Sequence, residues 1–483
     1  MNMHQFYYKQ SGIALIVFLT IFLLSATAIL LYRFNNRTDF VLENQVQTAR
    51  ALAQAKEALI GFAATYAETH PGQPQGYLPC PDYDGDGSAN PPCGTKGYSV
   101  IGRFPWRTLG LPPLRDGSAE CLWYAVSGRY KDNPKKTLTS DTNGLFIVKN
   151  ADDVTIANTE DANQAIAIIF APGRAIQGQN RTTTGNTLCG DNAQPINYLD
   201  HLEFDQNGDG VIDYAIENFS GHKTNETSGN PGGDNLPTAT PSIFVKAPLI
   251  REDSNIANVI FNDTLMLITP KDFEAVYERM NYWVAREVKR CLEEYANSNT
   301  DNKYPWASKL DSYDYIDDKN ERFGRIPDTL SKTHDNNSNM PINWTADPNA
   351  SSLSSPPCGV PICFDENQST DSSKCGNPPG IKDKNWYWWW WDEWKEMVFF
   401  AVDKKRCPTC SLSDPSTLTL SGTSMDMLVL VAGRKLDNQT RNDKTLINEY
   451  LEEGNIDGNE NFIQQWATDN FNDAVCGNSD CEL

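Results

Sequence analysis

The chain has 483 residues, with 63 Asp and Glu against 41 Lys and Arg and a formal net charge of −22. This length exceeds what one hydrophobic core usually holds, so at least two domains are expected. The charge and the lack of a basic patch exclude a nucleic-acid partner, because nothing would offset phosphate repulsion. All 12 cysteines follow the first apolar segment, and their even number is typical of a disulfide-bonded exported protein.

Residues 13–32 form an apolar run without a charged side chain. A helix of this length measures about 30 Å, which is enough to cross a bilayer core. Three interpretations compete: a cleaved secretory signal, a plain membrane anchor and a type IV prepilin segment. Ala26-Thr27-Ala28 offers a signal-peptidase site, but it lies inside the apolar run rather than after it.

Gln10-Ser11-Gly12 followed by Ile13-Ala14-Leu15-Ile16-Val17 resembles the processing site of the type IV pilin and pseudopilin superfamily. The resemblance implies that prepilin peptidase cuts between Gly12 and Ile13 and that Ile13 is then N-methylated. Most members carry Glu at the fifth mature position, where this chain has Val17. The large minor pseudopilin of type II secretion and some minor pilins, which are assigned to a filament tip, share this departure. A tip subunit has no neighbour above it, so a carboxylate buried there would only add a desolvation cost.

The first helix is expected to continue to residue 70. Apolar side chains recur at steps of three and four along one face, at Leu52, Ala55, Leu59, Phe62 and Tyr66. The proline of His70-Pro71-Gly72 then ends the helix. We therefore expect a long pilin helix over 13–70, transmembrane over 13–32; an anchor followed by a separate soluble helix is the alternative. The resemblance places the chain in the bacterial inner membrane as a single-pass protein with a periplasmic body, and later in a periplasmic filament or pilus tip.

The rest of the chain is interpreted as an internal duplication. Two short apolar runs, residues 165–170 and 427–431, are predicted as central strands. The fold class is then α+β, with a long N-terminal transmembrane and amphipathic pilin helix followed by two duplicated heads, each a helix plus an antiparallel sheet. Six landmarks recur in the same order: residues 59–63 with 292–296, 102–105 with 324–327, 122–126 with 398–402, 168–174 with 428–434, Arg181 with Arg441, and 198–200 with 450–452.

Five segments follow from this pattern. They are a leader at 1–12, the pilin helix at 13–70, a first head at 71–217, a linker and connecting strand at 218–265, and a second head at 266–483. The second head opens with a helix at 270–296, because Thr269-Pro270-Lys271-Asp272 supplies an N-cap, a first-position proline and an acid at the third. A polar insertion at 331–385 carries three cysteines.

Two acidic loops have the spacing of a calcium site, and calcium is the candidate cofactor. In each, oxygen-bearing residues stand at alternate positions before a glycine. Neither loop has the terminal Glu of an EF-hand, and an Asp/Gly/Asn turn without metal is the alternative. Tip pseudopilins of type II secretion bind calcium, which supports the site by analogy only. The ligands are Asp205, Asn207, Asp209, the Val211 carbonyl and Asp213 in one loop, and Asp82, Asp84 and Asp86 in the other.

The segment Trp386-Tyr387-Trp388-Trp389-Trp390-Trp391 is the densest aromatic feature of the body. Core or interdomain packing is favoured, because the segment precedes a predicted strand as Trp106 and Trp123 do in the first copy. The alternative is an exposed ligand surface formed by Trp388, Trp390 and Trp391.

The close cysteine pairs are Cys80/Cys93, Cys358/Cys363, Cys407/Cys410 and Cys476/Cys481, although pairing cannot be deduced from spacing. Cys407-Pro-Thr-Cys410 is expected to form a structural disulfide, with a redox pair or half of a zinc site as alternatives. Ser421-Gly422-Thr423-Ser424-Met425-Asp426 resembles the nucleophile motif of subtilisin-like proteases, but it runs into a predicted strand and lacks partner motifs. No catalytic residue is therefore assigned.

These features predict a minor pilin or pseudopilin that primes or caps a type IV pilus-like or type II secretion filament, and that is not an enzyme. Its expected partners are other pilins or pseudopilins, the inner-membrane assembly platform, prepilin peptidase and the membrane itself. A tip adhesin that binds a surface or glycan through the Trp-rich second head is the alternative function. A membrane-anchored hydrolase is the third, and it lacks any constellation of catalytic residues.

Overall fold

The computed structural model describes residues 13–70, 72–157, 164–182, 185, 187–190, 194–205, 211–219, 242–251, 259–298, 302–312, 315, 317–327, 391–456, 460–464, 472–477 and 481. Within these residues the chain is rich in strands, with eighteen strands in six sheets and three α-helices. The expected leader at 1–12 and the polar insertion at 331–385 lie outside the described residues.

The first head is built on a four-stranded antiparallel sheet. Its neighbours, in order, are β1 (Val100–Arg103), β2 (Trp123–Val126), β5 (Ala167–Ala171) and β11 (Thr264–Ile268). Every residue of β2 and β5 is buried, because one face of the sheet receives a helix and the other a second sheet. β5 confirms the strand predicted at 165–170; it starts two residues later and ends one residue later.

The second head repeats this sheet with the same strand order. Its neighbours are β12 (Phe323–Arg325), β13 (Val398–Val402), β16 (Met427–Val431) and β18 (Ala474–Cys476), again all antiparallel. Gly102-Arg103 and Gly324-Arg325, which recur in the two copies, lie in the equivalent edge strands β1 and β12. β16 has the predicted bounds of 427–431.

Each head also has a three-stranded sheet that contains a parallel pair. In head one the order is β4 (Thr155–Ala157), β3 (Phe146–Lys149) and β8 (Ser242–Val245), with β3 and β8 parallel. In head two it is β15 (Thr423–Ser424), β14 (Thr419–Leu420) and β17 (Asn461–Phe462), with β14 and β17 parallel. Two hairpins, β6 (His201–Phe204) with β7 (Tyr214–Glu217) and β9 (Ile250–Arg251) with β10 (Val259–Phe261), complete the strands.

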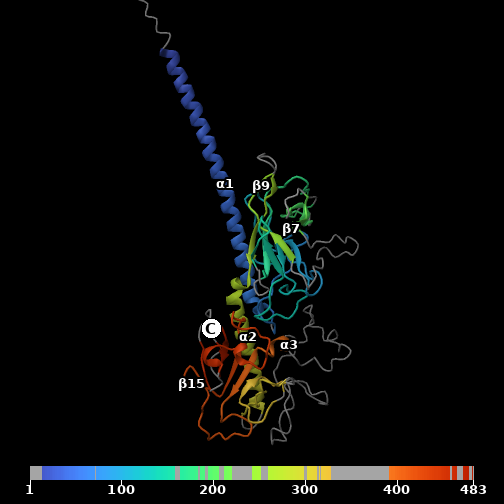
Figure 1. Ribbon diagram of the computed structural model, residues 1–483, viewed down its shortest axis with the longest axis vertical. Helices are drawn as coiled ribbons and strands as arrows, with labels where there is room; N and C mark the ends of the chain where they lie inside the picture. The colour runs from blue at the N-terminus through green and yellow to red at the C-terminus, as the bar shows by residue number, and fades with distance from the viewer. Residues whose placement is uncertain are drawn as a thin grey trace, which may run out of the picture.

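Each four-stranded sheet is covered by one helix. α1 (Ile13–Thr69) packs on β5 and β11 through the predicted stripe, of which Leu52, Ala55 and Leu59 are buried. α2 (Glu274–Ser298) packs on β16 and β18, after a single 3-10 turn at Pro270–Phe273, which confirms the helix predicted from residue 270. α3 (Trp391–Trp394) is a single turn before β13. Figure 1 shows α1 reaching far beyond head one at its N-terminal end, with head two beyond its C-terminal end.

Two expectations from the sequence are wrong. None of the helices in the described part of the chain is both long and apolar enough to cross a membrane. The transmembrane segment at 13–32 and the single-pass location in a bacterial inner membrane are therefore corrected.

The expected fold class is corrected with them. The first element is not a helix that could cross a membrane, and the heads are more than a helix on one antiparallel sheet. The stretch 218–265, expected to be a linker and connecting strand, contributes β8, β9, β10 and the start of β11. These strands escape detection because each has only two to five residues, too few to show a period.

Candidate functional site

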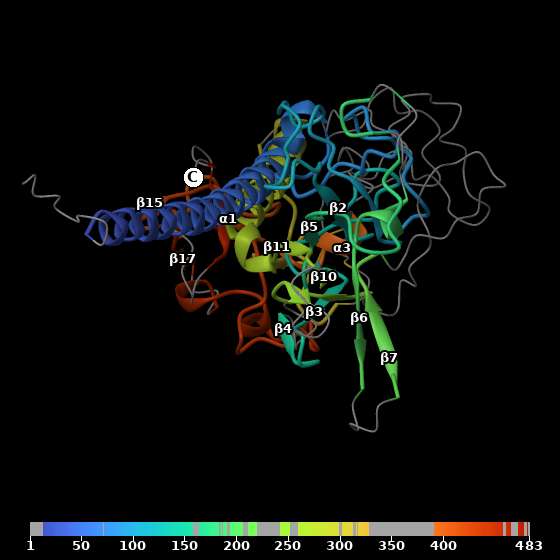
Figure 2. The ribbon, with the colours of Figure 1, turned by 90° about the horizontal axis from the view of Figure 1, so that it is seen from above.

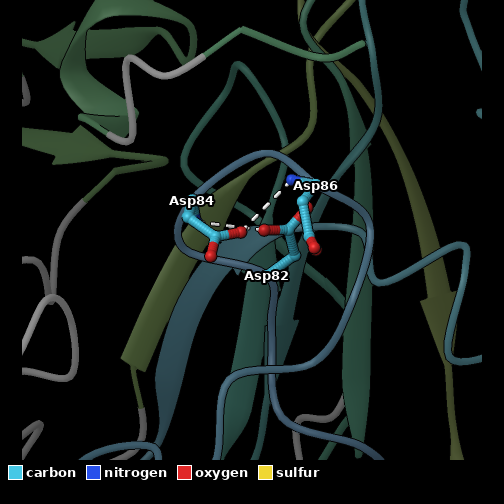
Figure 3. A group of neighbouring side chains, drawn as sticks. All are labelled: Asp82, Asp84 and Asp86. Carbon is cyan, nitrogen blue, oxygen red and sulfur yellow. Dashed lines mark hydrogen bonds between the residues drawn. The ribbon is translucent and has the colours of Figure 1, made fainter. Parts of the chain in front are cut away.

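The loop of Asp82, Asp84 and Asp86 is wound around its own carboxylates. Asp82 Oδ1 accepts hydrogen bonds from the backbone N–H groups of Asp84 (3.0 Å) and Gly85 (2.7 Å), and its Oδ2 accepts one from Gly87 (2.7 Å). Asp84 Oδ1 accepts the N–H of Asp86 (3.2 Å). These bonds turn the chain so that the three side chains lie close together, as Figure 3 shows.

The three carboxylates could hold a metal ion. One oxygen atom from each lies within 4.8 Å of the others, and a cluster of carboxylate oxygens is the ligand type that calcium prefers. Burial raises the pKa of Asp82 to about 6, and repulsion from Asp84 adds to this, against the opposing bonds from Gly87 and Gly85. A divalent cation would stabilise the ionised form of this buried acid, so the donor set fits calcium.

Asp86 is half-buried in the loop. The backbone N–H of Ser88 donates to its Oδ1 at 2.6 Å, and this bond is the main reason that its pKa is lowered. Arg107 Nη1 lies 3.1 Å from Asp86 Oδ2, at an exposed ion pair. In the absence of a metal, Arg107 therefore offsets part of the negative charge of the loop.

Two glycines allow the loop to pack against its surroundings. Gly87 has φ +90°, and a Cβ there would lie 2.1 Å from Cε2 of Trp106. Gly85 has φ +75°, and its Cβ would lie 2.0 Å from the carbonyl oxygen of Gly190. Both backbones adopt the left-handed region that favours glycine. The loop is therefore enclosed by Trp106 on one side and the segment at Gly190 on the other.

Two disulfides hold the segments around the acidic loop together. Cys80–Cys93 brackets the acidic residues, and Cys121–Cys189 ties the residue before Leu122 and β2 to the one before Gly190. Lys131 donates hydrogen bonds to the carbonyl oxygens of Cys93 and Thr95, and burial lowers its pKa to about 8. Cys407–Cys410, which was expected, and Cys476–Cys481 are disulfides between described residues of head two.

The second predicted calcium loop lies at the end of the hairpin β6–β7, which projects from head one in Figure 2. Asp205, Val211 and Asp213 are exposed, and Asp213 N–H donates to the carbonyl of Phe204 at 2.9 Å. The other two predicted ligands, Asn207 and Asp209, lie outside the described residues. The structure therefore brings together the three acids of the first loop but does not describe the ligand set of the second.

The remaining predicted residues are placed as follows. Gly12 lies outside the described residues, and α1 begins at Ile13. Trp388 and Trp390 also lie outside them, whereas Trp391 is only 2% exposed and belongs to the core. The protease-like sequence forms the turn between β14 and β15, where Ser421 has φ +48°, so no helix carries Ser424.

A buried carboxyl pair, which the sequence did not reveal, lies in head one. Asp200 accepts hydrogen bonds from the N–H of Asn262 (2.6 Å) and from Gln179 Nε2 (2.8 Å). Asp263 Oδ2 accepts the N–H of Asp200 (2.8 Å) and Nδ2 of Asn218 (3.0 Å). Burial, and then repulsion from Asp200, raises the pKa of Asp263 well above its usual value. Asp263 therefore keeps its proton at a higher pH than an ordinary aspartate does.

Head two contains the same arrangement. Glu452 accepts hydrogen bonds from the N–H of Asn472 (3.1 Å) and from Gln439 Nε2 (2.9 Å). Asp473 Oδ2 accepts the N–H of Glu452 (3.0 Å) and Nδ2 of Asn455 (3.2 Å). Burial and then Glu452 raise the pKa of Asp473 well above its usual value. One member of each pair, Asp263 or Asp473, lies directly before the last strand of its sheet, and the pair ties that residue to Asp200 or Glu452.

A sequence signal for these pairs exists. Asn262-Asp263 and Asn472-Asp473 each precede the last sheet strand of a head, and a Gln stands two residues before the repeated arginines Arg181 and Arg441. Short matches of this kind carry little weight until the strands beside them are known. Comparison with known proteins identifies no relative of this chain: no protein-family model, no curated protein and no solved structure matches it.

Proposed function

We propose that the chain is a structural subunit of a type IV pilus-like or type II secretion filament, of the minor pilin or pseudopilin kind, and that it performs no chemistry. The observation that carries this proposal is the uncovered apolar surface of α1. Phe18, Phe22 and Leu24 are 65–71% exposed, and Val41, Leu42 and Val46 are 48–60% exposed. Helices with such a surface pack against other helices, and a filament of pilin helices supplies them.

The position of head two supports a place at the end of a filament. Head one lies beside the second half of α1, and head two continues beyond the C-terminal end of this helix (Figure 1). A further subunit stacked along the direction of α1 would meet head two. Val17 in place of the usual Glu agrees with a subunit that has no neighbour above it.

Processing gives the first test. We expect the mature protein, made together with a prepilin peptidase, to begin at a methylated Ile13. Amino-terminal sequencing and intact mass measure this directly, and Gly12→Leu should leave the leader in place. A mature start at any other residue overturns the assignment to this superfamily.

Association through α1 gives the second test. Val46→Asp places a charge on the exposed apolar surface and should abolish cross-linking of the chain to other pilins. Gln45→Asp adds the same charge at a neighbouring exposed polar position and should leave cross-linking intact. Equal behaviour of the two variants contradicts a role for this surface.

We further propose that the loop of Asp82, Asp84 and Asp86 holds a calcium ion that stiffens head one. Calcium that binds only the folded protein stabilises it, by about 2.7 kcal/mol at a hundredfold excess over Kd. Millimolar calcium should therefore raise the thermal unfolding temperature, and Asp84→Asn should remove most of the rise. Asp152→Asn, at an exposed acid outside the loop, is the matched control. No shift with calcium would contradict the site.

The pH dependence of this shift follows from Asp82. Because its pKa is raised to about 6 by burial, Asp82 is protonated at lower pH and loses its affinity for a cation. The calcium-induced rise in unfolding temperature should therefore be full at neutral pH and disappear as the pH falls through about 6. A rise that is the same at pH 5 and pH 7 would show that Asp82 is not a ligand.

A further inference from the structure

Both heads carry an equivalent turn between the second strand of the four-stranded sheet and the first strand of the three-stranded sheet. In head one the turn is residues 139–142, where Thr142 N–H donates to the Thr139 carbonyl at 3.0 Å. In head two it is residues 411–414, where Asp414 N–H donates to the Ser411 carbonyl at 3.0 Å. A second hydrogen bond closes each turn: the backbone N–H of the first residue donates to the side chain of the fourth, from Thr139 to Thr142 in head one and from Ser411 to Asp414 in head two.

The turn of head one is held by head two of the same molecule. Arg434 Nη1 donates to the Ser140 carbonyl at 3.0 Å, and the N–H of Lys435 donates to Asp141 Oδ1 at 2.6 Å. Arg441 Nη1 forms an ion pair with Asp141 Oδ2 at 2.9 Å. The receiving site, which we call the Gly-Arg surface of head two, therefore consists of residues 433–435 and Arg441.

Head one has its own Gly-Arg surface, residues 173–175 with Arg181, built by the same contacts. Arg181 donates to the Gly173 carbonyl at 2.7 Å as Arg441 does to Gly433 at 2.9 Å. The two backbones are also braced alike: Asn262 and Asn472 donate from Nδ2 to the carbonyls of Arg174 and Arg434, both at 2.7 Å.

The two Gly-Arg surfaces differ in what covers them. Arg434 is half-buried under the turn of head one, whereas Arg174 is exposed. Arg181 pairs within its own head, with Glu120 Oε1 at 3.2 Å. The turn of head two is likewise uncovered, since Leu412 is 56% exposed. Asp414, the fourth residue of this turn, is opposite in charge to Arg174. In head one the acid that contacts the Gly-Arg surface is the third residue of the turn, Asp141.

We propose that the turn 411–414 of one molecule docks on the Gly-Arg surface of head one in a second copy of the chain. This contact uses the same two kinds of surface that join the heads within one molecule, with the acid one position later in the turn and Arg174 in place of Arg441 as its partner. It joins different surfaces on the two partners, so it continues from copy to copy instead of closing a dimer. It does not involve α1, so it is independent of the proposed filament role.

Charge reversal in the full-length chain tests the contact. Arg174→Asp and Asp414→Arg should each weaken self-association about tenfold or more in sedimentation, because like charges then face each other. Mixing the two variants should restore association, since each surface then meets an oppositely charged turn. Lys271→Asp makes the same reversal at an exposed site in the first turn of a helix and should change nothing.

Two results would overturn the proposal. One is self-association of the Arg174→Asp variant equal to that of the unchanged chain. The other is a mixture that associates no better than its two components. Circular dichroism must show both variants folded, and a conservative pair, Arg174→Gln and Asp414→Asn, repeats the test without repulsion. Association through α1 should respond to Val46→Asp but not to the changes at Arg174 and Asp414. The experiments therefore test the two proposed contacts independently.

Discussion

Single residues decide whether the acidic loop can form. Gly87 combines a left-handed backbone with a position where a Cβ would overlap the Trp106 ring. Gly110 also has a positive φ, +68°, but nothing lies within 4 Å of its added Cβ. The two glycines therefore separate backbone strain from steric overlap.

Gly87→Ala should destabilise the protein by roughly 1–3 kcal/mol, because backbone strain and the overlap with Trp106 add together. Gly110→Ala should lower the free energy of unfolding by only about 1 kcal/mol, since only the backbone strain contributes there. Chemical denaturation of the two variants measures both free energies of unfolding. A smaller loss at Gly87 than at Gly110 would show that the loop yields easily.

The carboxyl pairs make stability depend on pH in a defined direction. The pKa of Asp263 is raised by burial and by Asp200, so the folded state binds the proton more tightly than the unfolded chain. This contribution to stability is complete below the ordinary pKa of an aspartate and is lost as the pH rises toward the folded value. The positive charge of Arg181 opposes the shift.

Asp263→Asn should remove the loss of stability at rising pH, because the amide is uncharged at every pH. Its oxygen can still accept the hydrogen bonds from Asp200 and Asn218. Thermal unfolding between pH 5 and 9 should then show a flatter profile than the unchanged chain. Asp473→Asn should have the same effect through head two. A steeper fall with pH in either variant would contradict a proton shared within the pair.

At the scale of elements, the start of the second head is set by local chemistry. Asp272 Oδ2 accepts the N–H and the hydroxyl of Thr269, both at 2.8 Å, and Pro270 takes the first helical position. The same carboxylate receives Lys56 of α1 at 2.7 Å. The capping carboxylate of one helix therefore also forms an ion pair with the other helix.

Asp272→Ala should destabilise the protein by about 1–2 kcal/mol, since it removes the cap bond and the partner of Lys56. Asp272→Asn retains an acceptor for Thr269 and should lose less. Denaturant unfolding of the two variants and of Lys56→Met separates the cap from the ion pair. Equal losses in the alanine and asparagine variants would assign the effect to Lys56 alone.

At the scale of the molecule, the heads are joined by packed side chains and by polar contacts. A single cluster of buried apolar side chains extends through both helices and both four-stranded sheets. Trp394 Nε1 donates to the Leu138 carbonyl at 2.9 Å, and the hydroxyls of Tyr130 and Tyr277 are 2.7 Å apart. The heads should therefore unfold together.

Asp141→Ala removes the ion pair with Arg441 and the bond from Lys435. We expect it to weaken the junction by about 1–2 kcal/mol and to split one calorimetric unfolding transition into two. Asp152→Ala, at an exposed acid of head one, is the control. A single unchanged transition would show that the apolar cluster alone couples the heads.

Local sequence was sufficient where neighbours in the chain make the contacts. It determined the start of α2, the buried stripe of α1, the strands β5 and β16 and the spacing of the acidic loop. Each of these depends on a helical period, an apolar run or a turn, all of which are written within a few residues.

Only the tertiary structure decided what depends on distant residues. It assigned β11, which lies next to head two in the chain, to the sheet of head one. It also paired Cys121 with Cys189, and Asp200 with Asp263. It corrected the transmembrane interpretation of the first helix, because an apolar run states a preference for burial without naming the environment. Burial and pairing depend on which surfaces meet, and a sequence read in order does not contain that information.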